Sequence, residues 1–252
     1  EINLLNQLFA IFYGIGSIDI ASHILQTITE KTENPTTNTQ ISLFNNQGTL
    51  ELEKQRYGLA IEKISKAISA AGDLDYPAFM RAMYLNVVEA NLALNQLDEA
   101  KEKLDIAWQF AEPDGSQRYA LLFMSAKYLF KKNDFDKAKN SLEQIFNLRD
   151  LPDVWRWEAY YWLGKIFEKT GDNSQAEKSY QNAISALESM RDKVGYDTLK
   201  SNLMNKKRKP YEALFNLYAE RNDTDNAIKL FEKAQIESFI GSFIKTTKQQ
   251  VT

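Results

Sequence analysis

The chain has 252 residues, of which 44% are hydrophobic and 26% are charged, and its formal net charge is −3. This balance provides no strong electrostatic field for nucleic acid or a membrane surface, and no run of the sequence approaches the ~18 apolar residues of a membrane helix. Because the chain has no cysteine, it has no disulfide, thiolate metal site or cysteine nucleophile, and this composition favours a cytoplasmic location.

One pattern recurs along the whole chain at intervals of 39, 40, 38, 38 and 51 residues. Its centre is always an alanine: Ala21, Ala60, Ala100, Ala138, Ala176 and Ala227. Four residues later comes a larger apolar residue: Leu25, Ile64, Leu104, Leu142, Tyr180 and Phe231. Twelve residues before the alanine, half of the copies have a small residue: Phe9, Gly48, Val88, Ala126, Gly164 and Phe215. Such a period with small positions is typical of helical-hairpin arrays, since two helices approach closely only where one offers a hydrogen or a methyl group.

The six copies predict six helical hairpins in chain order. They cover residues 2–35, 41–75, 80–113, 119–151, 157–190 and 208–244. A polar stretch, residues 31–40, is expected to form a loop. The fifth hairpin is expected to run on past Glu188, with an insert over residues 191–207 that contains a short helix. The sequence therefore predicts one all-α domain over residues 1–252, a right-handed superhelix without strands that ends in an extended helix.

Turn and cap residues support this register. Every proline lies near the predicted start of a first helix, where its missing N–H costs nothing: Pro35, Pro77, Pro113, Pro152 and Pro210. Five residues before the repeated alanine, five copies have a residue that favours turns: Gly16, Asn95, Asn133, Gly171 and Asn222. Two residues before the alanine, five copies have a predicted N-cap of the second helix: Asp19, Asp98, Asp136, Ser174 and Asp225. The second copy has Gly58 at this cap position.

The fifth copy is the clearest of the six. It reads Tyr160, Leu163, Gly164, Phe167, Gly171, Ala176, Tyr180 and Ala183. This order of aromatic, small and alanine positions resembles the tetratricopeptide repeat. The spacing of 38–40 residues is about one helical turn longer than the family's usual ~34 residues, which resembles its long-repeat branch. The resemblance implies a stacked solenoid that binds proteins or peptides and is not an enzyme.

The residue types in the chain also argue against an enzyme, because the usual catalytic motifs are missing. The sequence has no glycine-rich phosphate loop, helical zinc motif or spaced histidine pair. The lone His23 falls on a predicted second helix, where we expect a solvent-facing or packing role. With one histidine and no cysteine, no set of nucleophile, base and orienting residue can be assembled. We therefore expect no catalysis, no cofactor and no metal site.

The tetratricopeptide resemblance implies a ligand groove lined by the first helices of the hairpins. The candidate residues are Phe123, Lys127, Phe130 and Lys131 in the fourth copy, and Tyr161, Lys165 and Lys169 in the fifth. The lysines occupy equivalent places in neighbouring repeats, so stacking would align four ammonium groups beside two aromatic rings. This arrangement favours an acidic, extended peptide. The alternative is that these lysines are ordinary solubilising charges, partly neutralised by Glu168.

A second resemblance covers about a quarter of the chain, from Tyr180 to Ile244. It is carried by Ala183, Glu188, Met190, Arg191, Leu203, Lys207, Tyr211, Ala227, Glu232, Lys233, Ala234 and Ser238. This stretch resembles the last repeats before the caspase-like protease domain of bacterial CHAT proteins, although Gln235 departs from their pattern. It implies a protease domain beyond Thr252, with this array as its regulatory arm. The alternative is a stand-alone adaptor or peptide receptor.

Two features near the C-terminus allow further expectations. The basic run from Lys206 to Lys209 is interpreted as a solvated helix end and not as a nucleic-acid site, because no aromatic residue is interleaved with it. An apolar stripe with helical spacing follows: Ile236, Phe239, Ile240, Phe243 and Ile244. We expect Phe239, Phe243 and Ile244 to dock a further domain or helix, because the end of a solenoid otherwise needs a polar outer face.

Overall fold

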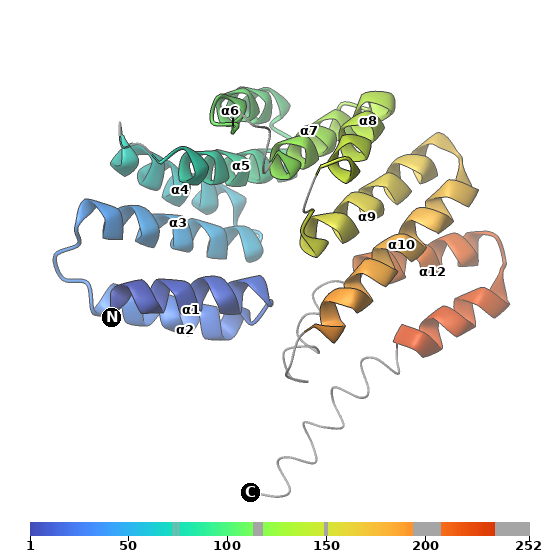
Figure 1. The fold of residues 1–252 in the computed structure, drawn as a ribbon, viewed down its shortest axis with the longest axis horizontal. Helices are drawn as coiled ribbons and strands as arrows, with labels where there is room; N and C mark the ends of the chain where they lie inside the picture. Colours follow the sequence, from blue (N-terminus) through green and yellow to red (C-terminus); the bar gives the residue numbers. More distant parts are fainter. Residues whose placement is uncertain (73, 75, 113–117, 149–150, 194–207, 235–252) are drawn as a thin grey trace, which may run out of the picture. The chain divides into compact units, whose positions relative to one another are not determined.

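The computed structural model describes residues 1–72, 74, 76–112, 118–148, 151–193 and 208–234 (Figure 1). Within these ranges every regular element is a helix, and none of them contains a strand. The helices pair into hairpins, as the repeat pattern predicts. The described helices include none that is long and apolar enough to cross a membrane.

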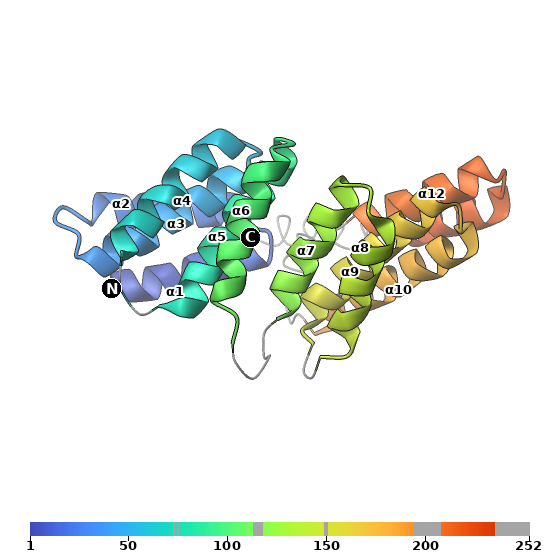
Figure 2. The same cartoon turned by 90° about the horizontal axis from the view of Figure 1, so that it is seen from above.

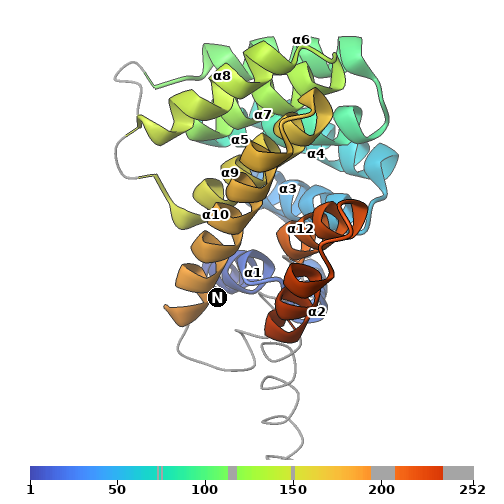
Figure 3. The same ribbon diagram turned by 90° about the vertical axis from the view of Figure 1, so that its right-hand side faces the viewer.

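The chain divides into two compact units, Glu1–Arg149 and Asp150–Thr252. In the first unit (Figure 2) the hairpins are α1 (Ile2–Gly14) with α2 (Ile18–Glu30), α3 (Thr37–Glu53) with α4 (Tyr57–Ala71), α5 (Pro77–Ala93) with α6 (Leu97–Gln109), and α7 (Tyr119–Lys131) with α8 (Phe135–Phe146). In the second unit (Figure 3), α9 (Asp153–Thr170) pairs with α10 (Asn173–Asp192), and α12 (Lys209–Glu220) is followed by a helix over residues 224–234. The single domain expected over residues 1–252 stays a prediction.

The first turns of the first helices explain where the connecting loops end. Thr36 caps α3 by accepting a hydrogen bond from the backbone N–H of Thr39, so the first loop is shorter than residues 31–40. Pro77 occupies the first turn of α5, and Pro152 is the N-cap residue of α9. Proline suits these positions because its fixed φ matches the helix and it has no N–H to satisfy.

The repeated alanines lie at the contact between the two helices of each hairpin. All six are buried: Ala21, Ala60, Ala100, Ala138, Ala176 and Ala227. The small residues twelve positions earlier are needed for the same approach. A Cβ atom added to Gly48 on α3 would lie 2.3 Å from Cγ1 of Ile64 on α4, which is far inside van der Waals contact. Apolar side chains around these contacts form buried clusters that continue from one hairpin into the next.

The turn between the two helices of each hairpin has one left-handed residue, five positions before the alanine. These residues have φ between 55° and 82°: Gly16, Gln55, Asn95, Asn133, Gly171 and Asn222. Five of the six are the predicted turn residues. The second copy uses Gln55, a residue type that rarely adopts this conformation.

The N-caps lie two residues earlier in the chain than the sequence predicts. The residue directly after the left-handed position is the cap, because it is the last one with non-helical backbone angles. Asp134, Asp172 and Asp223 therefore cap their helices, each accepting a hydrogen bond from the backbone N–H three residues on. Asp98 and Asp136 lie inside the first helical turn instead, where a negative charge is favourable beside the positive end of the helix dipole.

The last hairpin departs from the pattern of the other five. Phe215 and Phe231 occupy the two positions that are buried in the earlier copies, yet they are 39% and 54% exposed. The long α10 ends at Asp192, as the expected extension past Glu188 requires. Most of the predicted insert and the apolar stripe with Phe239, Phe243 and Ile244 lie outside the described residues.

Candidate functional site

Two equivalent aromatic–lysine pairs lie on first helices, one in each unit. Phe123 and Lys127 are on α7, and Tyr161 and Lys165 are at the same repeat positions on α9. The Nζ atom of Lys127 lies 5.7 Å from the ring centroid of Phe123, and that of Lys165 lies 6.0 Å from the ring centroid of Tyr161. A spacing of four residues places each ammonium over the ring one turn before it, and both distances suit a cation–π interaction.

In the first unit, the charge of Lys127 is already balanced. Its ammonium group forms an ion pair with the carboxylate of Glu89 on α5, and its side chain is only 13% exposed. Phe123 is buried beneath it. Phe130 packs edge-to-face against Phe135 at the turn of its own hairpin, with ring centroids 5.4 Å apart. Of the four residues predicted here, only Lys131 is exposed to solvent.

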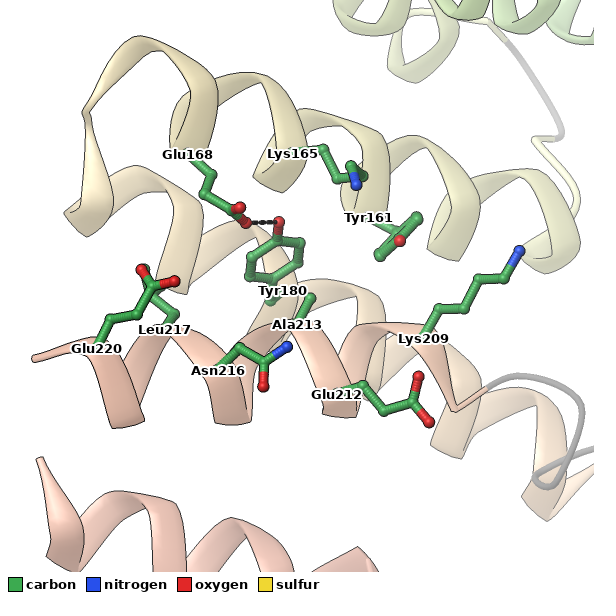
Figure 4. Close-up of a pocket in the computed structure, with 10 residues that line it drawn as sticks. All are labelled: Tyr161, Lys165, Glu168, Tyr180, Lys209, Glu212, Ala213, Asn216, Leu217 and Glu220. Carbon is green, nitrogen blue, oxygen red and sulfur yellow. Dashed lines mark hydrogen bonds between the residues drawn. The ribbon is translucent and has the colours of Figure 1, made fainter. Parts of the chain in front are cut away.

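In the second unit, α9, α10 and α12 enclose a pocket of about 230 Å³ (Figure 4). Its lining residues come mainly from the first helices of two successive hairpins: Tyr161, Lys165, Glu168, Tyr180, Lys209, Glu212, Ala213, Asn216, Leu217 and Glu220. Tyr161 and Lys165 were predicted from the sequence. Lys169 is exposed and lies outside this lining.

The α12 side of the pocket was missed by the sequence analysis. Glu212 and Asn216 lie fifteen and eleven residues before Ala227. These are the repeat positions that Tyr161 and Lys165 occupy before Ala176. The register of the sixth copy therefore contains the signal, but its residues are neither aromatic nor basic and do not repeat the lysines of the fourth and fifth copies.

Most acidic groups of the pocket already have partners. Glu168 accepts a hydrogen bond of 2.6 Å from the hydroxyl of Tyr180, and Glu212 forms an ion pair with Arg208 at 2.9 Å. Burial raises the pKa of Tyr180, and the hydrogen bond to Glu168 raises it further. Burial also raises the pKa of Tyr161, with a smaller contribution from the carboxylates of Glu168 and Glu212. Both hydroxyls therefore stay protonated at neutral pH and are hydrogen-bond donors.

The two lysines of the pocket are differently placed. Among the residues that the structure describes, Lys165 and Lys209 form no ion pair. Figure 4 shows the side chain of Tyr161 between them. The pocket can therefore offer two ammonium groups and an aromatic ring to a ligand carboxylate. The alignment of Lys127 and Lys131 with Lys165 and Lys169 in one stripe stays a prediction, because the two pairs belong to different units.

The described residues include few groups that could bind a metal ion or act as a base. They contain no group of three acidic or histidine side chains that could hold a metal ion. His23 is exposed on α2 and is not among the residues that line the pocket. The arrangement of side chains can bind and orient a ligand through charge, hydrogen bonds and an aromatic face.

Comparison with known proteins agrees with this description. Residues 158–186, which span most of the fifth hairpin, match the family model of the tetratricopeptide repeat. No curated protein sequence matches the chain. The fold is an all-α solenoid of tetratricopeptide-like hairpins, as solved structures of similar fold demonstrate.

Three solved structures illustrate the likeness. The Rap protein complexed with competence and sporulation factor has a TM-score of 0.69 and 18% identity over 88% of this chain and 60% of its own. NprR in complex with its cognate peptide NprX has a TM-score of 0.65 and 13% identity over 97% of this chain and 72% of its own. BtubC from P. vanneervenii has a TM-score of 0.58 and 14% identity over 88% of this chain and 89% of its own. The chain thus spans about 60% of the length of Rap.

Proposed function

We propose that this chain is a non-catalytic scaffold that binds a protein or an extended peptide along the first helices of its hairpins. The observation that carries the proposal is the pocket between α9 and α12, where Lys165 and Lys209 flank Tyr161 without carboxylate partners from the described chain. The fold is shared with NprR, whose structure contains its cognate peptide, and this supports a peptide ligand here.

The same pocket favours acidic residues in the ligand. Of its three carboxylates, Glu168 and Glu212 already contact Tyr180 and Arg208. Both lysines form no ion pair among the described residues. A carboxylate between two ammonium groups gains charge-assisted hydrogen bonds. In the first unit, Lys131 offers a further exposed charge, while Lys127 is held by Glu89. The ligand is therefore proposed to be an acidic, extended segment.

Fluorescence anisotropy with short, capped, fluorescein-labelled peptides tests this proposal. A glycine–serine peptide that carries several glutamates should bind, and its affinity should fall as salt is raised. The same peptide with glutamines should bind more weakly. The double variant Lys165→Gln/Lys209→Gln should lose several-fold in affinity, whereas Lys178→Gln, an exposed lysine on α10, is the matched control and should not. Failure of every peptide to bind would contradict the proposal.

A second proposal concerns a partner in the same polypeptide. The resemblance from Tyr180 to Ile244 favours a role as the regulatory arm of a caspase-like protease, with Phe239, Phe243 and Ile244 as its docking residues. The solved structures described above include no such protease, so this proposal rests on the resemblance alone. Determining the sequence that follows Thr252 in the gene tests it: a downstream histidine and cysteine on predicted strand ends would support it, and their absence would contradict it.

A further inference from the structure

We infer that the pocket between α9 and α12 selects a ligand segment that carries one acidic and one basic side chain, held at opposite ends of the pocket. This inference rests on the proposed function and adds the chemistry of the ligand.

The pocket is cationic at one end and anionic at the other. Along α9, Tyr161 and Lys165 precede Glu168, and along α12, Lys209 precedes Glu220. Figure 4 shows the two helices running in the same direction. Glu168 and Glu220 therefore lie at one end of the pocket and Lys209 lies at the other, with Lys165 nearer the middle.

The chain does not neutralise this separation of charge. Among the described residues, Lys165, Lys209 and Glu220 form no ion pair. Glu168 accepts the Tyr180 hydroxyl through one carboxylate oxygen, Oε2. The remaining carboxylate of the lining, Glu212, lies near the cationic end and is balanced by Arg208. The pocket is thus left with two cationic and two anionic groups for a ligand to match.

The spacing along the helices fits a short extended segment. Along α12, Glu220 lies eleven residues after Lys209, or roughly 16 Å at the ~1.5 Å rise of an α-helix. An extended peptide advances by about 3.3 Å per residue, so a basic side chain about five residues from an acidic one reaches the other end. Asn216 lines the middle of the pocket, and its amide can both donate to and accept from a peptide backbone.

Repulsion between like charges of the pocket and the ligand adds to the specificity for a mixed ligand. An acidic ligand that extends a second acidic side chain to the anionic end meets Glu168 and Glu220 there and so binds less tightly than a mixed one. A ligand with only basic side chains meets Lys165 and Lys209. Like charges brought together reduce affinity for the wrong ligand, which contributes to specificity as much as the favourable contacts do.

Matched peptides test the inference. Four capped, fluorescent glycine–serine peptides carry Glu and Lys about five residues apart, the same pair in reverse order, Glu with Gln, or Gln with Lys. In anisotropy titrations at low salt, one of the two Glu–Lys orders should bind roughly two- to fivefold more tightly than either singly charged peptide, as expected for exposed ion pairs.

Variants of the anionic end separate the alternatives. Glu220→Lys should abolish the advantage of the Glu–Lys peptide and improve binding of the Glu–Gln peptide. Glu232→Lys, an exposed residue of the last described helix, adds the same charge outside the pocket and should leave the advantage intact. If the Glu–Lys and Glu–Gln peptides bind equally to the parent chain, the inference is overturned and the proposed function stands. If no peptide binds, both are overturned.

Discussion

Gly164 on α9 lies directly against the aromatic ring of Tyr180 on α10: a Cβ atom added to the glycine would be 2.4 Å from Cε1 of the tyrosine. The ring is fully buried and its hydroxyl is tied to Glu168, so it cannot easily move aside. A hydrogen at position 164 is what lets the two helices approach with an aromatic residue between them.

Gly164→Ala should therefore destabilise the protein. The added methyl group must displace a buried ring or separate the helices, and overpacking of this kind costs about 1–3 kcal/mol. We expect a lower urea midpoint with an unchanged slope. Gly58→Ala is the matched control, because nothing lies within 4 Å of a Cβ atom added there and alanine is the better helix former. A midpoint equal to that of the parent for Gly164→Ala would contradict the proposed packing.

Gln55→Gly should stabilise the protein, although glycine usually weakens a chain. Gln55 has φ of 58°, a left-handed conformation that costs a residue with a side chain roughly 1 kcal/mol and costs glycine almost nothing. The same substitution at Gln144, an exposed helical position on α8, should instead destabilise by about 1 kcal/mol. Opposite shifts in melting temperature are the expected result. A decrease for both variants would show that the turn does not strain Gln55.

The hairpins could be predicted from the sequence because the alanine spacing and the turn residues are local signals. The left-handed turn at Gln55 could not, since glutamine has no preference for that conformation and only the register requires it. The caps were misplaced because aspartates occur both at the true position, as in Asp134, and two residues later, as in Asp136. The backbone angles of the preceding turn decide between them, and the sequence does not contain those angles directly.

The candidate site was predicted less completely than the hairpins. Of the predicted groove residues, Tyr161 and Lys165 line the pocket, and their part in ligand binding stays a prediction. The partner of Lys127 was missed, although Glu89 lies eleven residues before Ala100, just as Lys127 lies eleven before Ala138. Stacking of equivalent positions brings these two side chains together. Repeated lysines alone do not reveal such a pair, because the register also places an acidic residue at the equivalent position of the preceding copy.

This pairing predicts different roles for two equivalent lysines. Lys165→Gln should weaken binding of an acidic peptide and lower stability only by the contribution of its cation–π contact with Tyr161, since its ammonium group forms no ion pair among the described residues. Lys127→Gln should leave peptide binding nearly unchanged and lower stability slightly, because it leaves the carboxylate of Glu89 without its partner. Anisotropy titrations and thermal melts of both variants distinguish the roles.

The combined variant addresses the whole proposed stripe. Changing Lys127, Lys131, Lys165 and Lys169 to glutamine should reduce capture of an acidic peptide more than Lys165→Gln alone. If the quadruple variant captures the peptide as well as the parent does, the four lysines do not bind the ligand and are ordinary solubilising charges.

Alkaline pH should unfold the protein partly through Tyr180. Burial and the hydrogen bond to Glu168 raise the pKa of this hydroxyl above its ordinary value of 10.0, so the folded chain keeps it protonated. The unfolded chain releases the proton once the pH exceeds about 10, and each such tyrosine then lowers the free energy of unfolding by up to ~1.4 kcal/mol per pH unit. Its contribution to stability is thus complete below pH 10 and declines as the pH rises.

Tyr180→Phe isolates this contribution. At neutral pH the variant should be less stable by about 1 kcal/mol, because it lacks the hydrogen bond to Glu168. As the pH rises above 10 its stability should fall less steeply than that of the parent, since phenylalanine has no proton to release, and the two curves should converge. Urea unfolding at a series of pH values from neutral to alkaline measures both slopes. Parallel curves would mean that the Tyr180 hydroxyl ionises as readily in the folded chain as in the unfolded one, contrary to its burial against Gly164.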